Sequence, residues 1–225
     1  MNYTALKAAI IAYTDNQDSA FEAEVPVFVK QAEQRIYNSV QFPSLRKNVF
    51  GQVSSTNKYL QCPTDFLATY SIAIISGVVG SNLDTGTYEY LLNKDVNFIR
   101  QAYPTPNDRG LPKYYALFGP RSDNETELTF ILGPTPDQNY WTELHYYYYP
   151  DSIVDAGTSW LGDNFDSVLL YGALVEAYTY MKGEQDIVTL YNQKFMEALA
   201  LAKRLGDGLE RQDAYRSGQF RQKVT

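Results

Sequence analysis

The stretch from Ser167 to Met181 carries a single charged side chain, Glu176, and its apolar residues leave almost no polar face. A helix that is apolar all round is buried on all sides. This stretch is too short, and its tyrosines and glutamate too polar, to cross about 30 Å of hydrocarbon. Other helices, from the same chain or from neighbouring copies, must therefore cover it. The expected core positions of this helix are Val168, Leu169, Leu170, Leu174, Val175 and Tyr178.

Helical periodicity also marks the N-terminal part of the chain. A short amphipathic helix is expected around Leu6 to Tyr13. A second helix should start close to Val25, because Pro26 is tolerated only near a first turn, and should end before Phe42-Pro43. Three charged residues lie off the apolar stripe of this second helix: Lys30, Glu33 and Arg35.

The C-terminal part predicts two further helices separated by Gly183. Asp163 is the expected N-cap of the buried helix, and Asp166 adds a negative charge to its first turn. The last helix should run from about Gln185 to Leu205, with Gly206 as the residue that ends it.

Between these helical ends, short β-prone runs alternate with turn residues. The connectors are too short for repeated crossover helices, so the strands should pair antiparallel, with one helix at Asp95 to Tyr103. The expected strands are Asn48 to Ser54, Lys58 to Gln61, Thr69 to Ile75, Tyr88 to Leu92, Lys113 to Phe118, Glu127 to Leu132 and Trp141 to Tyr149.

The predicted fold is therefore α+β, with a central antiparallel β region inserted into a helical bundle. We expect four parts: N-terminal bundle helices (1–45), the inserted β-rich region (46–158), C-terminal bundle helices (159–206) and an extended C-terminal arm (207–225). Apolar and basic residues alternate in the arm, which is typical of a segment that orders on a partner. The arm residues expected at a partner interface are Leu209, Arg211, Tyr215, Arg216, Phe220 and Arg221.

Residues with catalytic or metal-binding chemistry are sparse. The formal charge of −7 disfavours electrostatic nucleic-acid binding. Cys62 is the only cysteine and is expected to be a buried filler, and His145 is the only histidine. His145 should share a strand face with Tyr147 and Tyr149 and serve packing. Phosphate-binding glycine motifs and calcium loops are absent from the sequence. We therefore predict no catalytic residue, no cofactor and no metal.

Three segments resemble the adaptor proteins of tailed bacteriophages, which form the head-to-tail connector below the portal. They are residues 27–36 (VFVKQAEQRI), residues 59–67 (YLQCPTDFL), and Trp160 to Asn164 running into the buried helix and on to Lys182. The resemblance implies a ring of twelve copies, a helical bundle docked to the portal, a C-terminal arm that reaches the portal or neighbouring subunits, and a β region turned towards the next tail component.

The leading hypothesis is a non-enzymatic structural protein of the virion neck. It would bind the portal on one side and a tail or nozzle protein on the other, and DNA would pass through the ring without specific binding. No secretion signal or membrane span is predicted, so synthesis in the host cytoplasm is expected. The alternative is a carbohydrate- or receptor-binding virion module that uses a tyrosine-rich sheet, since the chain has 20 tyrosines. A glycoside hydrolase ranks well below both.

Overall fold

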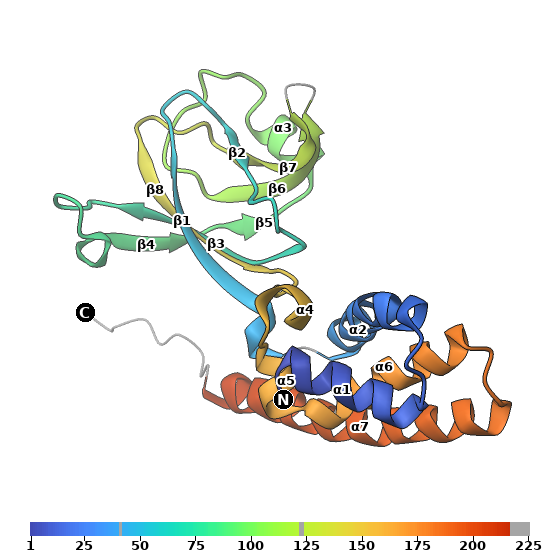
Figure 1. The fold of residues 1–225 in the computed structure, drawn as a ribbon. Helices are drawn as coiled ribbons and strands as arrows, with labels where there is room; N and C mark the ends of the chain where they lie inside the picture. The colour runs from blue at the N-terminus through green and yellow to red at the C-terminus, as the bar shows by residue number, and fades with distance from the viewer. Residues whose placement is uncertain (41, 122–123, 217–225) are drawn as a thin grey trace. The chain divides into compact units, whose positions relative to one another are not determined.

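The computed structural model describes residues 1–40, 42–121 and 124–216 (Figure 1), with the backbone alone at residues 43, 121, 124–127 and 205–216. The chain divides into two compact units. The helical unit comprises Met1–Leu45 and Tyr149–Thr225, and the β unit comprises Arg46–Tyr148. The first and last parts of the sequence therefore build one unit together, and the central part builds the other. The predicted α+β class is confirmed.

The helical unit is organised around α6 (Asp166–Tyr180), which corresponds to the predicted buried helix. Helix α6 packs against α1, α2, α5 and α7. The bounds of the other helices of this unit are α1 (Tyr3–Thr14), α2 (Ser19–Ser39), α4 (Ile153–Ala156), α5 (Trp160–Asn164) and α7 (Gln185–Arg216). A short 3-10 turn, η1 (Pro43–Leu45), leads into the β unit.

Close packing around α6 depends on Gly172. A Cβ atom at this position would lie 3.2 Å from the Cβ of Ala32 on α2 and 3.1 Å from the Phe195 ring on α7. Glycine therefore lets the three helices approach closely here, and a larger residue would push its neighbours apart by a few tenths of an ångström. The apolar residues that α6 buries are Val168, Leu169, Leu170, Ala173, Leu174, Val175 and Ala177, while Tyr178 is half-buried.

Membrane crossing can be assessed for the helices built from described residues. None of these helices is both long enough and apolar enough to span a bilayer.

Helix α2 begins at Ser19, so the start predicted near Val25 is wrong. Asp18 caps the helix by accepting a hydrogen bond from the backbone N–H of Ala20 at 3.2 Å. Pro26 therefore lies inside the helix and removes one backbone hydrogen bond, which costs about 3 kcal/mol. Burial of Phe21, at about 1.5 to 3 kcal/mol for a large apolar side chain, offsets much of this cost because the ring is 2 % exposed and packs on Phe28.

Two other predicted helix boundaries also differ from the structure. Asp163 lies inside α5, which Ser159 caps, and α6 follows with no side-chain cap. The predicted end of the last helix at Leu205 is wrong too, because α7 continues through Gly206 to Arg216. Gly206 and Gly208 each cost about 1 kcal/mol in a helix, but each further residue of an established helix adds a hydrogen bond, so the two glycines do not end it.

The β unit contains two four-stranded sheets. In the described residues, all strand pairs are antiparallel except β5 and β6, which pair in parallel. The first sheet has the order β1-β8-β3-β4, with β1 (Arg46–Val53), β8 (Tyr140–Tyr147), β3 (Ala68–Ser76) and β4 (Thr87–Tyr90). The second has the order β2-β7-β6-β5, with β2 (Tyr59–Gln61), β7 (Asn124–Gly133), β6 (Tyr114–Arg121) and β5 (Leu92–Asn93).

The two sheets enclose a core of their own. Its largest members include Phe130, Ile72, Ile74 and Tyr146, and it also contains Cys62, which is buried as predicted. The outer side of the second sheet is covered by α3 (Val96–Ala102), whose Ile99 packs on Ala116 and Ile131. A short 3-10 turn, η2 (Leu83–Thr85), lies between β3 and β4. The β unit therefore has a hydrophobic centre separate from that of the helical unit.

Glu33 on α2 is buried, although its position off the apolar stripe predicts an exposed side chain. It is 3 % exposed, and its Oε1 accepts a hydrogen bond from the backbone N–H of Ile153 at 3.0 Å. Burial raises the pKa of the carboxyl group, and the hydrogen bonds from Ile153 and Ser152 only partly oppose this shift. Glu33 therefore anchors the start of α4 to α2.

Replacing Leu174 with Asp should lower the free energy of unfolding by about 3 to 5 kcal/mol, because the new charge is buried without a partner. Urea denaturation of the full chain measures this loss. The matched control is Asn192→Asp, at an exposed position of α7, which should change the stability by less than about 0.5 kcal/mol. Equal stability of the two variants would contradict the central position of α6.

Replacing Glu33 should separate its charge from its hydrogen bond. Because the folded-state pKa is raised, the contribution of Glu33 to stability is full below its unfolded-state pKa and is lost as the pH rises through the folded-state pKa. Glu33→Gln, which keeps the acceptor, should therefore gain stability relative to the wild type as the pH rises from 4 to 7. Glu33→Ala should lose about 1 to 3 kcal/mol at both pH values, because the Ile153 N–H loses its partner. Urea titrations at both pH values measure the differences in the free energy of unfolding. If this free energy changes with pH by the same amount in the wild type and in the Gln variant, the raised pKa of Glu33 is refuted.

Candidate partner-binding site

The first sheet of the β unit has one face in the core and one face outside it. Alternate residues of a strand point to opposite faces, and Leu144 and Tyr146 of β8 point into the core. Their neighbours Glu143 and His145 therefore point outward. The register places Phe50 and Ala73 beside Glu143, and Tyr90 beside Ala73. We call this surface the aromatic face; its members are Arg46, Asn48, Phe50, Tyr70, Tyr88, Tyr90, Trp141, Glu143, His145 and Tyr147.

Large rings of the aromatic face are open to solvent. Tyr90 is 61 % exposed, Tyr70 is 50 % exposed and Phe50 is 45 % exposed. Within the described part of the β unit, the α-helix α3 packs on the other sheet, against β6 and β7. Exposed aromatic side chains that gather on one sheet are typical of a protein interface, where a ring buries much area at a low entropic cost.

A polar group lies at the centre of this face. The Glu143 side chain is buried among its neighbours, and its Oε1 accepts a hydrogen bond from Asn48 Nδ2 at 2.6 Å. The same oxygen lies 3.4 Å from His145 Nε2. Burial, and then the negative charge of Glu143, raises the pKa of the Tyr88 hydroxyl. The carboxylate fixes the polar side chains around it, while the rings at its rim stay open.

Arg46 lies at one end of the aromatic face. Its guanidinium is 4.4 Å from the centre of the Tyr70 ring and 5.6 Å from that of Tyr147. The two rings contact each other edge to face at 6.0 Å. A cation held against two rings orients both of them, so this end of the face is preorganised for contact with a partner.

The predicted strand of His145, Tyr147 and Tyr149 is only partly correct. His145 and Tyr147 share the outer face of β8, but the strand ends at Tyr147 and Tyr149 belongs to the helical unit. There Tyr149 stacks on Tyr37 and donates a hydrogen bond to Asn38 Oδ1. In the residues that the structure describes, no group of three or more His, Cys, Asp or Glu side chains is arranged to hold a metal ion.

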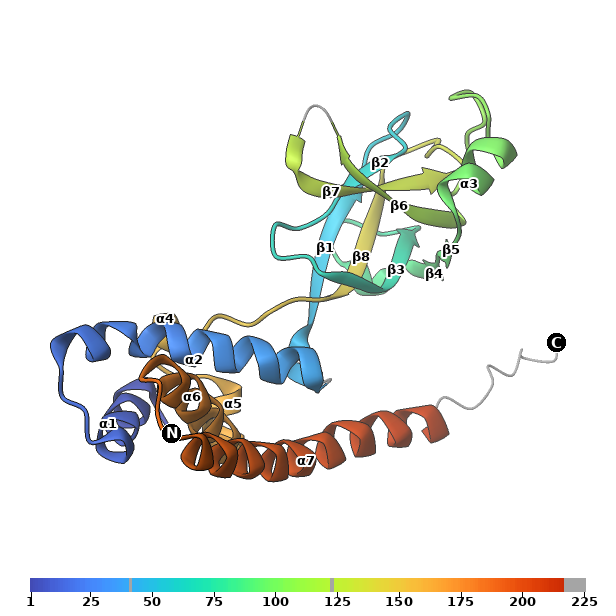
Figure 2. The same ribbon diagram turned by 90° about the vertical axis from the view of Figure 1, so that its right-hand side faces the viewer.

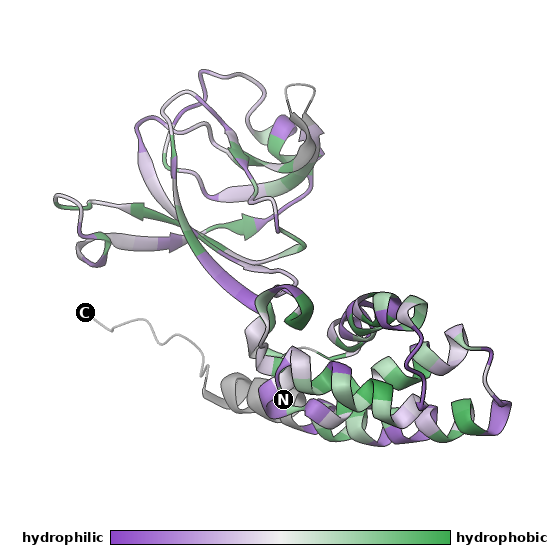
Figure 3. Ribbon diagram, in the orientation of Figure 1, coloured by the Kyte–Doolittle hydropathy of each residue, from purple (hydrophilic) through white to green (hydrophobic). Residues whose placement is uncertain are grey.

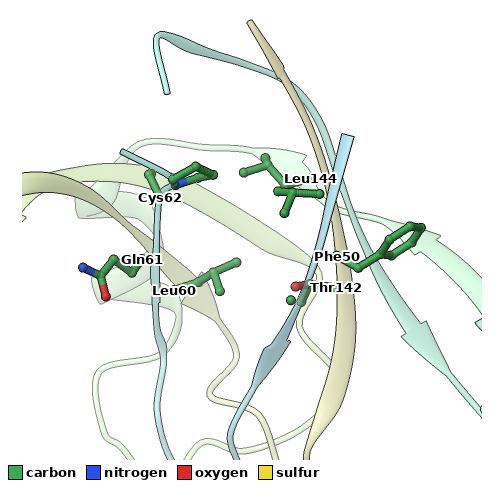
Figure 4. Close-up of a pocket in the computed structure, with 9 residues that line it drawn as sticks. Phe50, Leu60, Gln61, Cys62, Thr142 and Leu144 are labelled. Atoms are coloured by element: carbon green, nitrogen blue, oxygen red, sulfur yellow. The ribbon is translucent and has the colours of Figure 1, made fainter. Parts of the chain in front are cut away.

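A slot of about 330 Å³ lies between the edge strands β1 and β2 (Figure 4). Leu60 and Leu144 line it, whereas Phe50 points away from it onto the aromatic face. The slot is mainly apolar, so it suits an aliphatic side chain better than a sugar, which needs several hydrogen-bonding groups. The other lining residues are Val49, Gly51, Gln61, Cys62, Pro63 and Thr142.

The predicted arm lies only partly within the described residues. Leu209, Arg211, Tyr215 and Arg216 belong to the C-terminal turns of α7, where the backbone is helical. Phe220 and Arg221 lie outside the described residues. The six predicted residues are thus divided between a helix and the segment that follows it.

The sequence corresponds to a known phage family. The family model described as SU10 adaptor protein matches residues 1–222. The chain belongs to this family of tailed-phage adaptor proteins. No curated protein matches the chain. The family match covers both units, so the helical unit and the β unit are both parts of the adaptor.

Sequence reasoning named the tyrosine-rich sheet but missed most members of the aromatic face. Phe50 and Tyr90 lie on strands that are far apart in the sequence, and they reach one face through β8 and β3. Strand alternation within β1 and β4 was the available signal, but it does not tell which strands are neighbours. Glu33 was missed for a similar reason, because its partner Ile153 is distant in the sequence.

Proposed function

We propose that this adaptor protein acts as a subunit of a ring in the virion neck, which joins the portal to the tail or nozzle and continues the DNA channel without catalysis. The observation that carries the proposal is the family match over residues 1–222, combined with a chain that folds into two units with separate cores. A protein that joins two partners needs two binding surfaces, and separate cores allow each unit to present its own.

The two units take different partners in this proposal. The helical unit binds the portal, and the aromatic face of the β unit binds the tail-side protein. Tyr and Trp residues are enriched among the residues that dominate binding energy, and Tyr70, Tyr90 and Trp141 all lie on the aromatic face. The C-terminal residues Leu209, Arg211, Tyr215, Arg216, Phe220 and Arg221 contact partner chains after assembly.

The ring contains twelve copies and is held by heterologous contacts, in which two different surfaces of one subunit meet those of its neighbours. DNA passes through the ring without specific binding. The formal charge of −7 supports this, since a net negative charge repels the phosphates of DNA. The protein is made in the host cytoplasm and acts in the neck of the virion.

A carbohydrate- or receptor-binding virion module is the alternative function, and it would use the same aromatic face. The exposed rings of Tyr70 and Tyr90 favour this candidate as a stacking platform for sugars. Substitutions in the aromatic face distinguish the two functions. They should weaken binding to the tail-side protein if the chain is an adaptor, and binding to a glycan or receptor if the alternative holds.

Removing two rings from the aromatic face should weaken binding to the tail-side protein and leave binding to the portal unchanged. In Phe50→Ser/Tyr90→Ser, we expect the affinity for the tail or nozzle protein to fall at least about thirtyfold, because a binding hot spot contributes about 2 kcal/mol or more. Leu117→Ser is the control, since Leu117 is 48 % exposed on the other sheet. Binding is measured by interferometry, and rings on portal particles are counted by electron microscopy. Intact tail binding combined with lost glycan binding would favour the alternative.

Truncation after Arg216 should test the terminal segment. It removes Phe220 and Arg221 and leaves α7 complete, so the thermal unfolding of the subunit should stay unchanged. We expect weaker assembly on portal particles, because the proposed contacts of Phe220 and Arg221 with a partner chain are lost. Capture of the truncated protein by portal particles at physiological salt, compared with capture of the full chain, measures the effect. Equal capture would show that the segment contributes nothing.

A further inference from the structure

Charge is distributed unevenly along this chain. Residues 203–225 contain six basic and three acidic residues, a formal charge of +3. The rest of the helical unit, residues 1–45 and 149–202, contains five basic and thirteen acidic residues, a formal charge of −8. The β unit, with eight basic and ten acidic residues, is close to neutral at −2. The helical unit therefore combines a strongly acidic body with a basic C-terminal stretch.

Acidic residues gather at one end of the helical unit, where two loops lie side by side. Asn16 Nδ2 of the α1–α2 loop lies 3.4 Å from the Met181 sulfur at the end of α6. Tyr178 Oη also donates a hydrogen bond to the backbone oxygen of Tyr13 at 2.9 Å. Figure 3 shows both loops as hydrophilic. We call this the acidic end; its acidic residues, all exposed, are Asp15, Asp18, Glu184 and Asp186, beside the single cation Lys182.

A basic stretch of α7 starts at Lys203. Ala202 is the last buried residue among the described side chains of α7, and Lys203 and Arg204 directly after it are exposed. The helix then continues to Arg216, and Figure 2 shows its C-terminal turns extending past the other helices of the unit. We call Lys203 and Arg204, the basic residues of this stretch whose side chains the structure describes, the basic end.

The two ends cannot neutralise each other within one subunit. Asp186 and Lys203 lie on the same helix, which at 1.5 Å per residue separates them by about 26 Å. That distance is about three times the screening length of 8 Å at physiological ionic strength. Several charged residues of the two ends also form no ion pair within the described part of the chain. They are Asp15, Glu184, Asp186, Lys203 and Arg204. These charges are available to another molecule.

The helix dipole alone does not explain this arrangement. Acidic residues at the start of a helix and basic residues at its end are stabilising, but the effect fades within the first and last turns. Asp186 is in the first turn of α7, yet Lys203 and Arg204 lie more than three turns before Arg216. Asp15, in turn, belongs to the loop between two other helices. The charges therefore point to a contact surface.

We propose that the basic end of one subunit docks on the acidic end of a second copy of this chain. This inference rests on the proposed oligomeric adaptor and names its subunit contact. A second copy is the occupant that the charges favour, because every copy carries both complementary surfaces. Two different surfaces that meet in this way form a heterologous contact, and such a contact closes into a ring when its rotation allows. Opposite charges also speed the encounter of two acidic subunits that would otherwise repel each other.

The test uses two charge-inverted versions of the full chain. The first is Lys203→Glu/Arg204→Glu, in which both ends are acidic. The second is Glu184→Lys/Asp186→Lys. Its acidic end then carries three lysines beside Asp15 and Asp18, so both ends have a net positive charge. Each variant should associate with itself at least about tenfold more weakly than the wild type at physiological salt. An equimolar mixture of the two should recover association, because each inverted end then meets an opposite charge.

Association is measured by sedimentation velocity and by the count of rings on portal particles. Lys94→Glu/Lys113→Glu in the β unit gives the same change of net charge as Lys203→Glu/Arg204→Glu and should associate like the wild type. Thermal unfolding of each variant checks that the helical unit stays folded. The proposal is overturned if the mixture associates no better than the separate variants, or if either inversion leaves association unchanged. If the variants still form rings on portal particles, the proposed subunit contact is refuted but the proposed adaptor function is not. If the wild type forms no ring on portal particles, the subunit contact and the adaptor function are both refuted.

Discussion

Helix α6 has no polar side wide enough to face water, and this constraint organises the helical unit. Its cover comes from α1 and α2 at the start of the chain and from α5 and α7 at the end. Both ends of the sequence must therefore return to the same place, so whatever lies between them is an insertion. The structure meets this condition through β1 and β8, which pair as neighbours where the chain leaves the helical unit and comes back.

An inserted unit of this kind needs a core of its own, because α6 is already covered. The two sheets supply it through residues such as Phe130 and Ile74, and α3 closes one outer side. The remaining outer side is the aromatic face. Its rings are therefore not required for the stability of either core, which leaves them free to serve binding. A structural protein with two partners gains from this separation, since contacts at one unit place few demands on the packing of the other.

Sequence periodicity was sufficient for most elements, and local signals failed where distant packing outweighed them. Pro26 predicted a late start of α2, but burial of Phe21 extends the helix by almost two turns before the proline. Gly206 predicted the end of α7, yet the helix continues to Arg216. Glu33 and the aromatic face depend on partners far along the chain, and a single sequence does not show which distant residues meet. The family resemblance, in contrast, was carried by short segments and is confirmed over residues 1–222.

The continuation of α7 past Gly206 also changes what its charges can do. A flexible arm with the same residues could fold back, and its cations could approach the acidic loops of their own subunit. A helix cannot do so, because its rise of 1.5 Å per residue holds Arg216 about 45 Å from Asp186. The rigid helix thus converts an uneven charge distribution in the sequence into a separation in space. The exposed charges at the two ends are then open to another molecule, as the proposed subunit contact requires.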